Sequence, residues 1–275
     1  MSYLSVSTWS LHRLLGPLRW TIWDSLNETQ QIAIQDQTQS LTLLELPAEA
    51  ARRGYQAVEI CHFHFPATDP VYLNQLKDAF RASVVQFDTL LLDYGDVTSA
   101  DPVRRESDTA YIRNWIEIAS LSGARQIRVI AGEADSSDEE AILRSAGILS
   151  ELALYAKAYG VSVITENFKE LTSLASSCLK ILERTGNSVN MITDFGNFSG
   201  SLKYAEIAAT VPYSVSIHAK AGYDENGYPD EDEFRRCLTA VRDQGYEGAY
   251  VLIYDGPGDM WEGLERIKRI VREYM

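Results

Sequence analysis

The sequence is poor in cysteine and has no long apolar run, and these scarcities exclude whole classes of protein. Its three cysteines, Cys61, Cys178 and Cys237, are odd in number and far apart, so they form neither a disulfide framework nor a zinc-ribbon pattern. Cys178 and Cys237 fall on expected helices, where we expect buried free thiols, whereas Cys61 ends an expected strand and is a candidate to line a site. No segment stays apolar for long enough to span a membrane as a helix.

Basic residues are also scarce relative to acidic ones. The chain has 25 Lys and Arg against 39 Asp and Glu, which gives a formal net charge of −14. Such a charge repels phosphate backbones and anionic lipid surfaces at long range, so we expect neither nucleic acid nor a membrane as a partner. Residues 1–8 lack the basic start and the cleavage site of a secretory signal, which predicts a cytoplasmic protein.

A glycine-rich phosphate loop is missing as well, because the turn after the first expected strand reads Trp9-Ser-Leu-His12. The chain instead alternates short β-type runs with longer helical runs. The expected strands cover residues 3–8, 57–61, 84–91, 126–131, 161–166, 190–194, 215–218 and 249–254. Eight strand-then-helix units in this length favour a closed (β/α)₈ TIM barrel over an open sheet, and we expect a single domain over residues 1–275.

The helices of this scheme are expected between the strands. They cover residues 43–53, 71–81, 171–184, 202–209, 232–244 and 261–274, with two more after residues 101 and 137. Asp101-Pro102 opens the first of these two, and Ser137 with Glu140 predicts a capping box for the second. The inner face of that second helix is expected to carry Leu143, Ala146, Leu149, Ala153 and Ala156.

Residues 9–40 depart from the scheme because they form a connection much longer than the usual βα loop. Loops of this kind build the active-site face of a barrel, so we expect the segment to act as a lid or a pocket wall. Its aromatic content argues against disorder. Trp9 and His12 at its start are the candidate substrate contacts, and Trp20 and Trp23 follow them.

Functional side chains of a barrel gather where its strands end. The fifth, sixth and seventh expected strands end in Glu166, Asp194 and His218, respectively, with the latter followed by Lys220. Each of the three has an ordinary structural explanation alone: a carboxylate bound by backbone amides, a turn cap, or a hydrogen-bonded core histidine. At three consecutive strand ends, two carboxylates and an imidazole instead predict a site for Mn²⁺, Mg²⁺, Co²⁺ or Zn²⁺.

Four segments of the chain resemble a known family. They are Thr165-Glu-Asn167, Asp194-Phe-Gly-Asn197, His218-Ala-Lys220 and Gly245-Tyr-Glu-Gly248, and they are similar to segments of the xylose-isomerase-like TIM barrels. That superfamily includes sugar and sugar-phosphate isomerases and epimerases, inosose dehydratases and the endonuclease IV branch. The resemblance implies a divalent metal held by Glu166, Asp194 and His218, with a further carboxylate from the eighth strand.

This chain departs from the family pattern at the fourth ligand, where Ile253 takes the place of the expected glutamate. Isoleucine can neither bind a metal nor move a proton. Asp255 lies on the same face of the strand but ~6–7 Å further out. We treat it as a candidate ligand or base, with hydrogen bonding to a substrate hydroxyl and stabilisation of the turn as open alternatives.

Further candidates surround these positions. His62 and His64 follow the second expected strand, alternate onto one face, and resemble a pocket-edge His-Phe-Pro loop of some family members; packing is the alternative. Lys220 is a candidate to neutralise a substrate oxyanion or hold a phosphate. Asn167 and Asn197 are candidates to orient ligands or to bind sugar hydroxyls. Glu59 is expected to make a buried hydrogen-bonded contact.

The leading hypothesis is a metal-dependent sugar or sugar-phosphate isomerase or epimerase, acting through a metal-stabilised enediolate. Glu166 is the expected base, Lys220 the expected partner of the oxygen charge, and Asp255 the candidate second acid or base. The substrate class is a small sugar, polyol or sugar phosphate, and a homo-oligomer is allowed. The alternatives are an inosose-dehydratase-like lyase and a non-catalytic sugar-binding barrel, which Ile253 keeps open. Four histidines and a charge of −14 count against an endonuclease IV-like phosphodiesterase.

Overall fold

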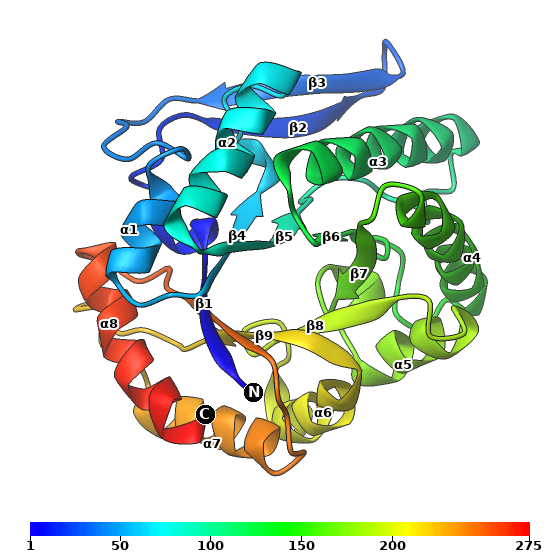
Figure 1. Ribbon diagram of the computed structural model, residues 1–275. Helices are drawn as coiled ribbons and strands as arrows, with labels where there is room; N and C mark the ends of the chain where they lie inside the picture. The colour runs from blue at the N-terminus through cyan, green and yellow to red at the C-terminus, as the bar shows by residue number, and fades with distance from the viewer.

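The computed structural model describes residues 1–275 and has the predicted closed parallel barrel with helices between its strands (Figure 1). The barrel strands are β1 (Tyr3–Ser7), β4 (Ala57–Cys61), β5 (Gln86–Leu91), β6 (Gln126–Arg128), β7 (Ser162–Glu166), β8 (Asn190–Asp194), β9 (Ser214–Lys220) and β10 (Ala249–Ile253). They are neighbours in chain order, and β1 closes the ring by pairing with both β4 and β10.

Eight α-helices surround this ring. They are α1 (Leu46–Arg52), α2 (Pro70–Ser83), α3 (Pro102–Ser122), α4 (Glu139–Lys157), α5 (Ala175–Arg184), α6 (Lys203–Thr210), α7 (Glu231–Arg242) and α8 (Met260–Val271). Five of them begin after an aspartate whose carboxylate accepts backbone N–H groups of the first turn, which would otherwise lack partners. These caps are Asp69, Asp101, Asp138, Asp230 and Asp259.

Two details of α4 were predicted wrongly. Its cap is Asp138 and not Ser137, since the Asp138 carboxylate accepts from the amides of Glu140 and Ala141. Leu143 is 63% exposed, and the inner face runs through Ile142 and Leu149 among others. Ala146, Leu149 and Ala156 are buried as predicted, so the inner face was misplaced only at Leu143 and Ala153.

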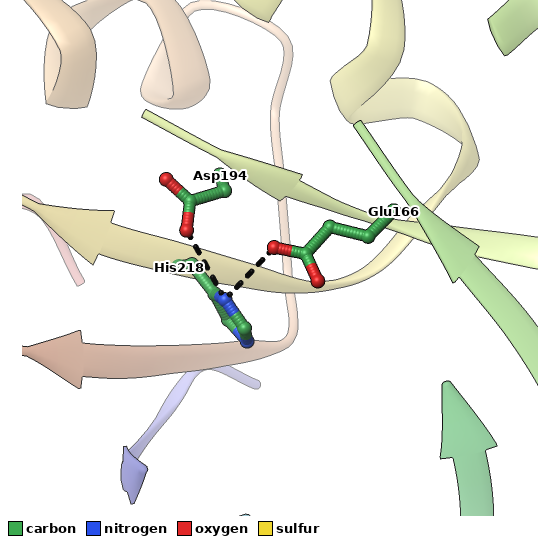
Figure 2. Close-up of side chains that lie close together, drawn as sticks. All are labelled: Glu166, Asp194 and His218. Carbon is green, nitrogen blue, oxygen red and sulfur yellow. Dashed lines mark ion pairs between the residues drawn. The ribbon is translucent and has the colours of Figure 1, made fainter. Parts of the chain in front are cut away.

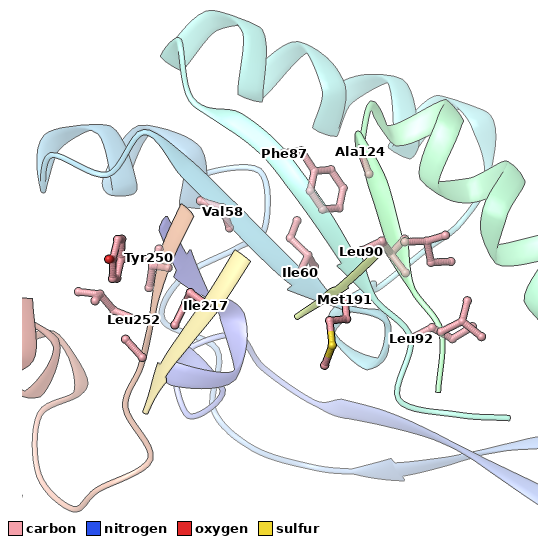
Figure 3. Packing of buried hydrophobic residues seen from close by; sticks show 14 of the residues in the cluster. Val58, Ile60, Phe87, Leu90, Leu92, Ala124, Met191, Ile217, Tyr250 and Leu252 are labelled. Carbon is pink, nitrogen blue, oxygen red and sulfur yellow. The ribbon is translucent and has the colours of Figure 1, made fainter. Parts of the chain in front are cut away.

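The core follows from the alternation of side chains along each strand. In β10, Tyr250 and Leu252 point outward and join a cluster of 62 buried residues between the strands and the helices. Ala249, Val251 and Ile253 form a separate small cluster inside the barrel. Figure 3 shows part of the outer layer, in which residues such as Val58, Leu90 and Ile217 of different strands pack beneath the helices.

The long connection after β1 contains a β-hairpin. After the 3₁₀ turn η1 (Thr8–Leu11), strands β2 (Leu18–Asp24) and β3 (Thr29–Gln35) pair antiparallel as a two-stranded sheet of their own. Figure 1 shows this hairpin outside the barrel, alongside α2 and α3. The hairpin was not predicted, although the segment was expected to be ordered.

Strand limits differ slightly from expectation. Val84 has a left-handed backbone (φ 55°) and terminates α2, so β5 begins at Gln86, and β6 ends at Arg128 rather than at residue 131. All three cysteines are free and buried, as predicted for Cys178 and Cys237. No helix combines the length and the apolar character that crossing a bilayer requires.

Candidate functional site

Glu166, Asp194 and His218 converge at the mouth of the barrel. Glu166 and Asp194 are the last residues of β7 and β8, and His218 is paired in register with Asp194 across β8 and β9. His218 Nδ1 lies 3.4 Å from Glu166 Oε1 and 3.4 Å from Asp194 Oδ2, as Figure 2 shows. All three side chains are buried, and one donor atom of each lies within 4.8 Å of the others.

The opposite nitrogen of the His218 ring contacts Glu59, a fully buried residue of β4. His218 Nε2 is 2.7 Å from Glu59 Oε2, and Thr89 donates a 2.8 Å hydrogen bond to the other oxygen of that carboxylate. An ionised carboxylate only accepts, so Nε2 carries a proton and donates it to Glu59. When the ring is neutral, the lone pair of Nδ1 therefore faces the two carboxylates of Glu166 and Asp194.

That arrangement concentrates negative charge in a buried space and calls for a cation. Burial lowers the pKa of the His218 imidazole, but Glu59 and Glu166 outweigh burial and raise that pKa well above its ordinary value. The cluster thus takes up a proton when no metal competes for it. A divalent ion would neutralise the same charge more fully, since burying unpaired carboxylates is costly.

The spacing and chemistry of the donor atoms fit a divalent ion. Ligands bound at about 2.0–2.2 Å to one ion lie roughly 3–3.5 Å from each other, which matches the 3.4 Å from His218 Nδ1 to each carboxylate. Metal-binding histidines commonly donate their second ring N–H to a carboxylate, the role that Glu59 fills. The residues present are therefore suited to hold Zn²⁺ or a similar ion.

Polar neighbours fix the Glu166 carboxylate and the backbone of Asp194. Arg128 Nε of β6 lies 2.9 Å from Glu166 Oε2, and the same guanidinium forms an ion pair with Asp93. Asn197 donates to Glu166 Oε1 at 3.3 Å. Asn167 makes two backbone contacts, donating to the Asp194 carbonyl at 2.9 Å and accepting from the Asp194 amide at 2.7 Å. Asn167 therefore locks the end of β8 and is buried away from the pocket.

These groups open into a pocket of about 330 Å³. Charged and polar side chains share its lining with four aromatic rings. Its lining residues are Ser7, Trp9, Trp20, Cys61, Phe63, Leu91, Asp93, Arg128, Glu166, Phe168, Lys169, Asp194, Asn197, His218, Lys220 and Ile253. Trp9, Asn197 and Lys220 were predicted as site residues, and Cys61 was left open as a pocket residue.

The β10 side of the pocket differs in character because it presents Ile253, which is 3% exposed. Its neighbour in register is Lys220 of β9, and Lys220 Nζ lies 2.6 Å from Asp255 Oδ2. Asp255 lies outside the donor cluster and lines an adjacent hollow together with Lys220. Gly196 leaves room for this lysine, since a Cβ there would lie 2.7 Å from Lys220 Cδ. The carboxylate of Asp255 is thus engaged by an ammonium group.

The other predicted histidines lie behind the pocket wall. His62 and His64 belong to a 3₁₀ turn, η2 (His62–His64), so the strand alternation expected for them is wrong. His64 Nδ1 contacts Thr8 Oγ1 at 2.9 Å, and burial lowers the pKa of His64 to about 3. His12 stacks on Trp9 with ring centroids 4.9 Å apart and donates from Nδ1 to the Trp9 carbonyl at 2.7 Å. None of these three histidines lines the pocket.

Arg128, Asp93 and Phe63 were missed by sequence reasoning, and Glu59 was expected only as a buried contact. Glu59 and Arg128 each interrupt an otherwise apolar strand segment, Ala57–Cys61 and the run after Gln126. A charged residue inside such a segment must find a partner when buried, and that signal was available. Asp93 follows its strand in a loop, Phe63 lies in the turn η2, and neither carries a comparable signal.

Comparison with known proteins agrees with the barrel fold. The sequence model of a family described as xylose isomerase-like TIM barrel matches residues 47–270. Comparison with curated proteins found no sequence relative. An L-ribulose 3-epimerase structure is 16% identical, with 100% of this chain and 96% of that chain covered and a TM-score of 0.70.

Two further solved structures have the same fold. The probable 3-DHS dehydratase AsbF from Bacillus anthracis is 15% identical, with 98% of each chain covered and a TM-score of 0.69. The IOLI protein, solved with a binding zinc atom, is 15% identical, with 99% of each chain covered and a TM-score of 0.69. At these identities the likeness concerns the fold of the whole chain.

Proposed function

Because the chain belongs to the xylose isomerase-like TIM barrel family, we propose that it is a metal-dependent isomerase or epimerase of a small sugar or polyol. The observation that carries this proposal is the position of His218 Nδ1, 3.4 Å from both Glu166 and Asp194. Two buried carboxylates beside one oriented imidazole suit a metal site and contribute little to apolar packing. The epimerase and the zinc-containing protein of the same fold support this choice.

The proposed reaction moves a proton at a carbon next to a carbonyl. A divalent ion held by Glu166, Asp194 and His218 would polarise the carbonyl and hydroxyl oxygens and so acidify the C–H between them. Glu166 is the proposed proton acceptor, oriented by Arg128 and Asn197. Lys220 lines the same pocket and is proposed to stabilise negative charge on a substrate oxygen.

Ile253 bears on the type of proton transfer. Epimerisation by two bases removes a proton from one face of the carbon and returns one to the other face, so it needs acid–base groups on both sides. A 1,2-isomerisation or a dehydration needs only one carboxylate base. With Ile253 on the β10 side and Asp255 paired to Lys220, we favour these one-base reactions, isomerisation first and a dehydratase-type lyase second.

The experiment combines metal binding with proton exchange. Purified protein is titrated with Zn²⁺ and Mn²⁺ by calorimetry, and a panel of ketoses and inososes is followed by NMR in D₂O for loss of C–H signals. We expect one high-affinity metal site and metal-dependent exchange, with both lost in His218→Ala and exchange lost in Glu166→Gln. Glu170→Gln, at an exposed rim position, is the matched control and keeps both. Metal binding without exchange on any substrate would favour a non-catalytic sugar-binding barrel.

A further inference from the structure

The β2–β3 hairpin is fastened to the barrel close to the pocket. Thr21 of β2 is buried, and its hydroxyl lies 3.2 Å from His62 Nε2 and 2.8 Å from Tyr111 Oη. His62 Nδ1 accepts the Asp93 amide at 3.1 Å, so Nε2 carries the ring proton and donates it to Thr21. From β3, Gln30 donates to the buried Asp108 of α3 at 3.1 Å.

These contacts connect the hairpin to the proposed metal ligands. His62 binds the backbone of Asp93, the Asp93 side chain pairs with Arg128, and Arg128 pairs with Glu166. These contacts are buried or half-buried, and the last of them is an ion pair in which Arg128 Nε and Glu166 Oε2 lie 2.9 Å apart without hydrogen-bond geometry. The hairpin is thus a fixed wall whose distance from Glu166 is set by this chain of contacts.

The side chain that this wall presents to the pocket is Trp20. Its ring centroid lies 4.3 Å from that of Phe63, and Trp9 meets Phe63 edge to face at 6.2 Å. Trp20 Nε1 donates to Gln35 of β3 at 3.1 Å, which satisfies its only polar atom and fixes the ring. The three rings form an aromatic wall (Trp9, Trp20 and Phe63) in the same pocket as Glu166, Asp194 and His218. Such a surface suits the C–H face of a sugar or cyclitol ring.

The charges in the pocket oppose an anionic ligand. Three cationic side chains line it, and each already has a carboxylate partner. Arg128 pairs with Asp93 and Glu166, Lys220 lies 2.6 Å from Asp255, and Lys169 lies 3.7 Å from Glu133. A phosphate carries about −1.5 to −2 charges at pH 7 and needs free donors, preferably cationic ones. The proposed metal ion would neutralise Glu166 and Asp194, so what disfavours a phosphate here is the lack of a cationic donor without a carboxylate partner.

We propose that the site selects an uncharged sugar or cyclitol over its phosphate ester, and that Trp20, presented by the β2–β3 hairpin, supplies the apolar wall against which the ring of that ligand packs. The inference rests on the proposed function and narrows its substrate class. Trp20 supplies apolar contact, and the pairing of each lining cation with a carboxylate leaves no free cationic donor for the phosphate. The long insertion after β1 is therefore a permanent part of the binding surface.

The test measures binding, separately from turnover. Calorimetry with protein in the presence of Mn²⁺ compares D-fructose, D-allulose and myo-inositol with D-fructose 6-phosphate. At least one uncharged compound is expected to bind about tenfold or more tightly than the phosphate ester, and Trp20→Ala is expected to weaken it by about tenfold. Trp20→Phe is expected to recover part of the loss. Trp23→Ala, on the same strand but outside the pocket, is the matched control and is expected to bind like the wild type.

Several results would overturn the inference. They are tighter binding of the phosphate ester, failure of all three uncharged compounds to bind, or equal losses in Trp20→Ala and Trp23→Ala. The two proposals fail separately. Proton exchange seen only on a phosphorylated sugar would support the proposed function and refute the specificity for uncharged sugars. Trp20-dependent binding of an uncharged sugar without any proton exchange would support that specificity and refute the proposed function.

Discussion

His62 should make the stability of this protein depend on pH in a way that can be calculated. Burial lowers the pKa of His62 from 6.5 to about 4, although the nearby Asp93 partly opposes this shift. The unfolded chain therefore binds a proton first as the pH falls, and the native state loses stability below about pH 6.5 until His62 itself is protonated near pH 4. At 1.36 kcal/mol per pKa unit, this histidine accounts for a loss of about 3 kcal/mol between pH 7 and pH 4.

His62→Gln isolates that contribution. The glutamine amide offers one acceptor for the Asp93 amide and one donor for Thr21, so it reproduces both hydrogen bonds without titrating. Urea unfolding followed by circular dichroism at half-unit steps from pH 7 to pH 4 gives the free energy of unfolding of both proteins. The difference between them should change by about 3 kcal/mol over this range, in favour of the variant at low pH. Parallel profiles would refute the reasoning, because they would mean that His62 titrates normally in the native state.

Three further variants test other parts of the structure. Ile253→Glu adds a carboxylate beside Glu166, Asp194 and His218, so it should lower the melting temperature of the metal-free protein. It should also tighten Zn²⁺ binding about tenfold or more in a dye competition assay, and unchanged affinity would contradict the position assigned to residue 253. Glu59→Gln removes the charge behind His218 and should weaken Zn²⁺ binding by about 10–100-fold, while circular dichroism shows the fold unchanged. Wild-type affinity would exclude a role of Glu59 in orienting His218. Gly147→Ala lies on the exposed side of α4, where a Cβ meets nothing within 4 Å, and should raise the free energy of unfolding measured in urea by about 0.5–1 kcal/mol. A lower free energy of unfolding would contradict the open space assigned to this position.

The barrel could be predicted because its signals are local. Each strand is a short apolar run, and each helix has a repeating apolar stripe and often an aspartate cap, so the eight units could be counted without knowing any contact. The β2–β3 hairpin could not, because its second strand is mostly polar and its turn lacks the Asn-Gly or Asp-Gly pair that marks short hairpins. Glu28 instead adopts the left-handed conformation at φ 51°. What holds this hairpin is contact with distant residues such as His62 and Asp108.

The same distinction applies to the site. Glu166, Asp194 and His218 could be predicted as a group, since parallel strands end on one face of a barrel. The pairing of Arg128 with Glu166 depends on side-chain lengths and rotamers, which no spacing encodes. The roles predicted for Lys220, Asp255 and the asparagines remain predictions, and the structure adds that Lys220 and Asp255 act on each other.

The closure of the ring through β1 has a consequence for synthesis of the chain. Val6 pairs on one side with Val58 of β4 and on the other with Leu252 of β10, far later in the chain. Until β10 has left the ribosome, the nascent sheet keeps two open edges, at β1 and at β9, with unpaired backbone groups. The proposed metal ligands from β7, β8 and β9 emerge earlier, but the pairing that completes the barrel waits for β10, its last strand, so the growing polypeptide exposes unpaired sheet edges that favour aggregation until then.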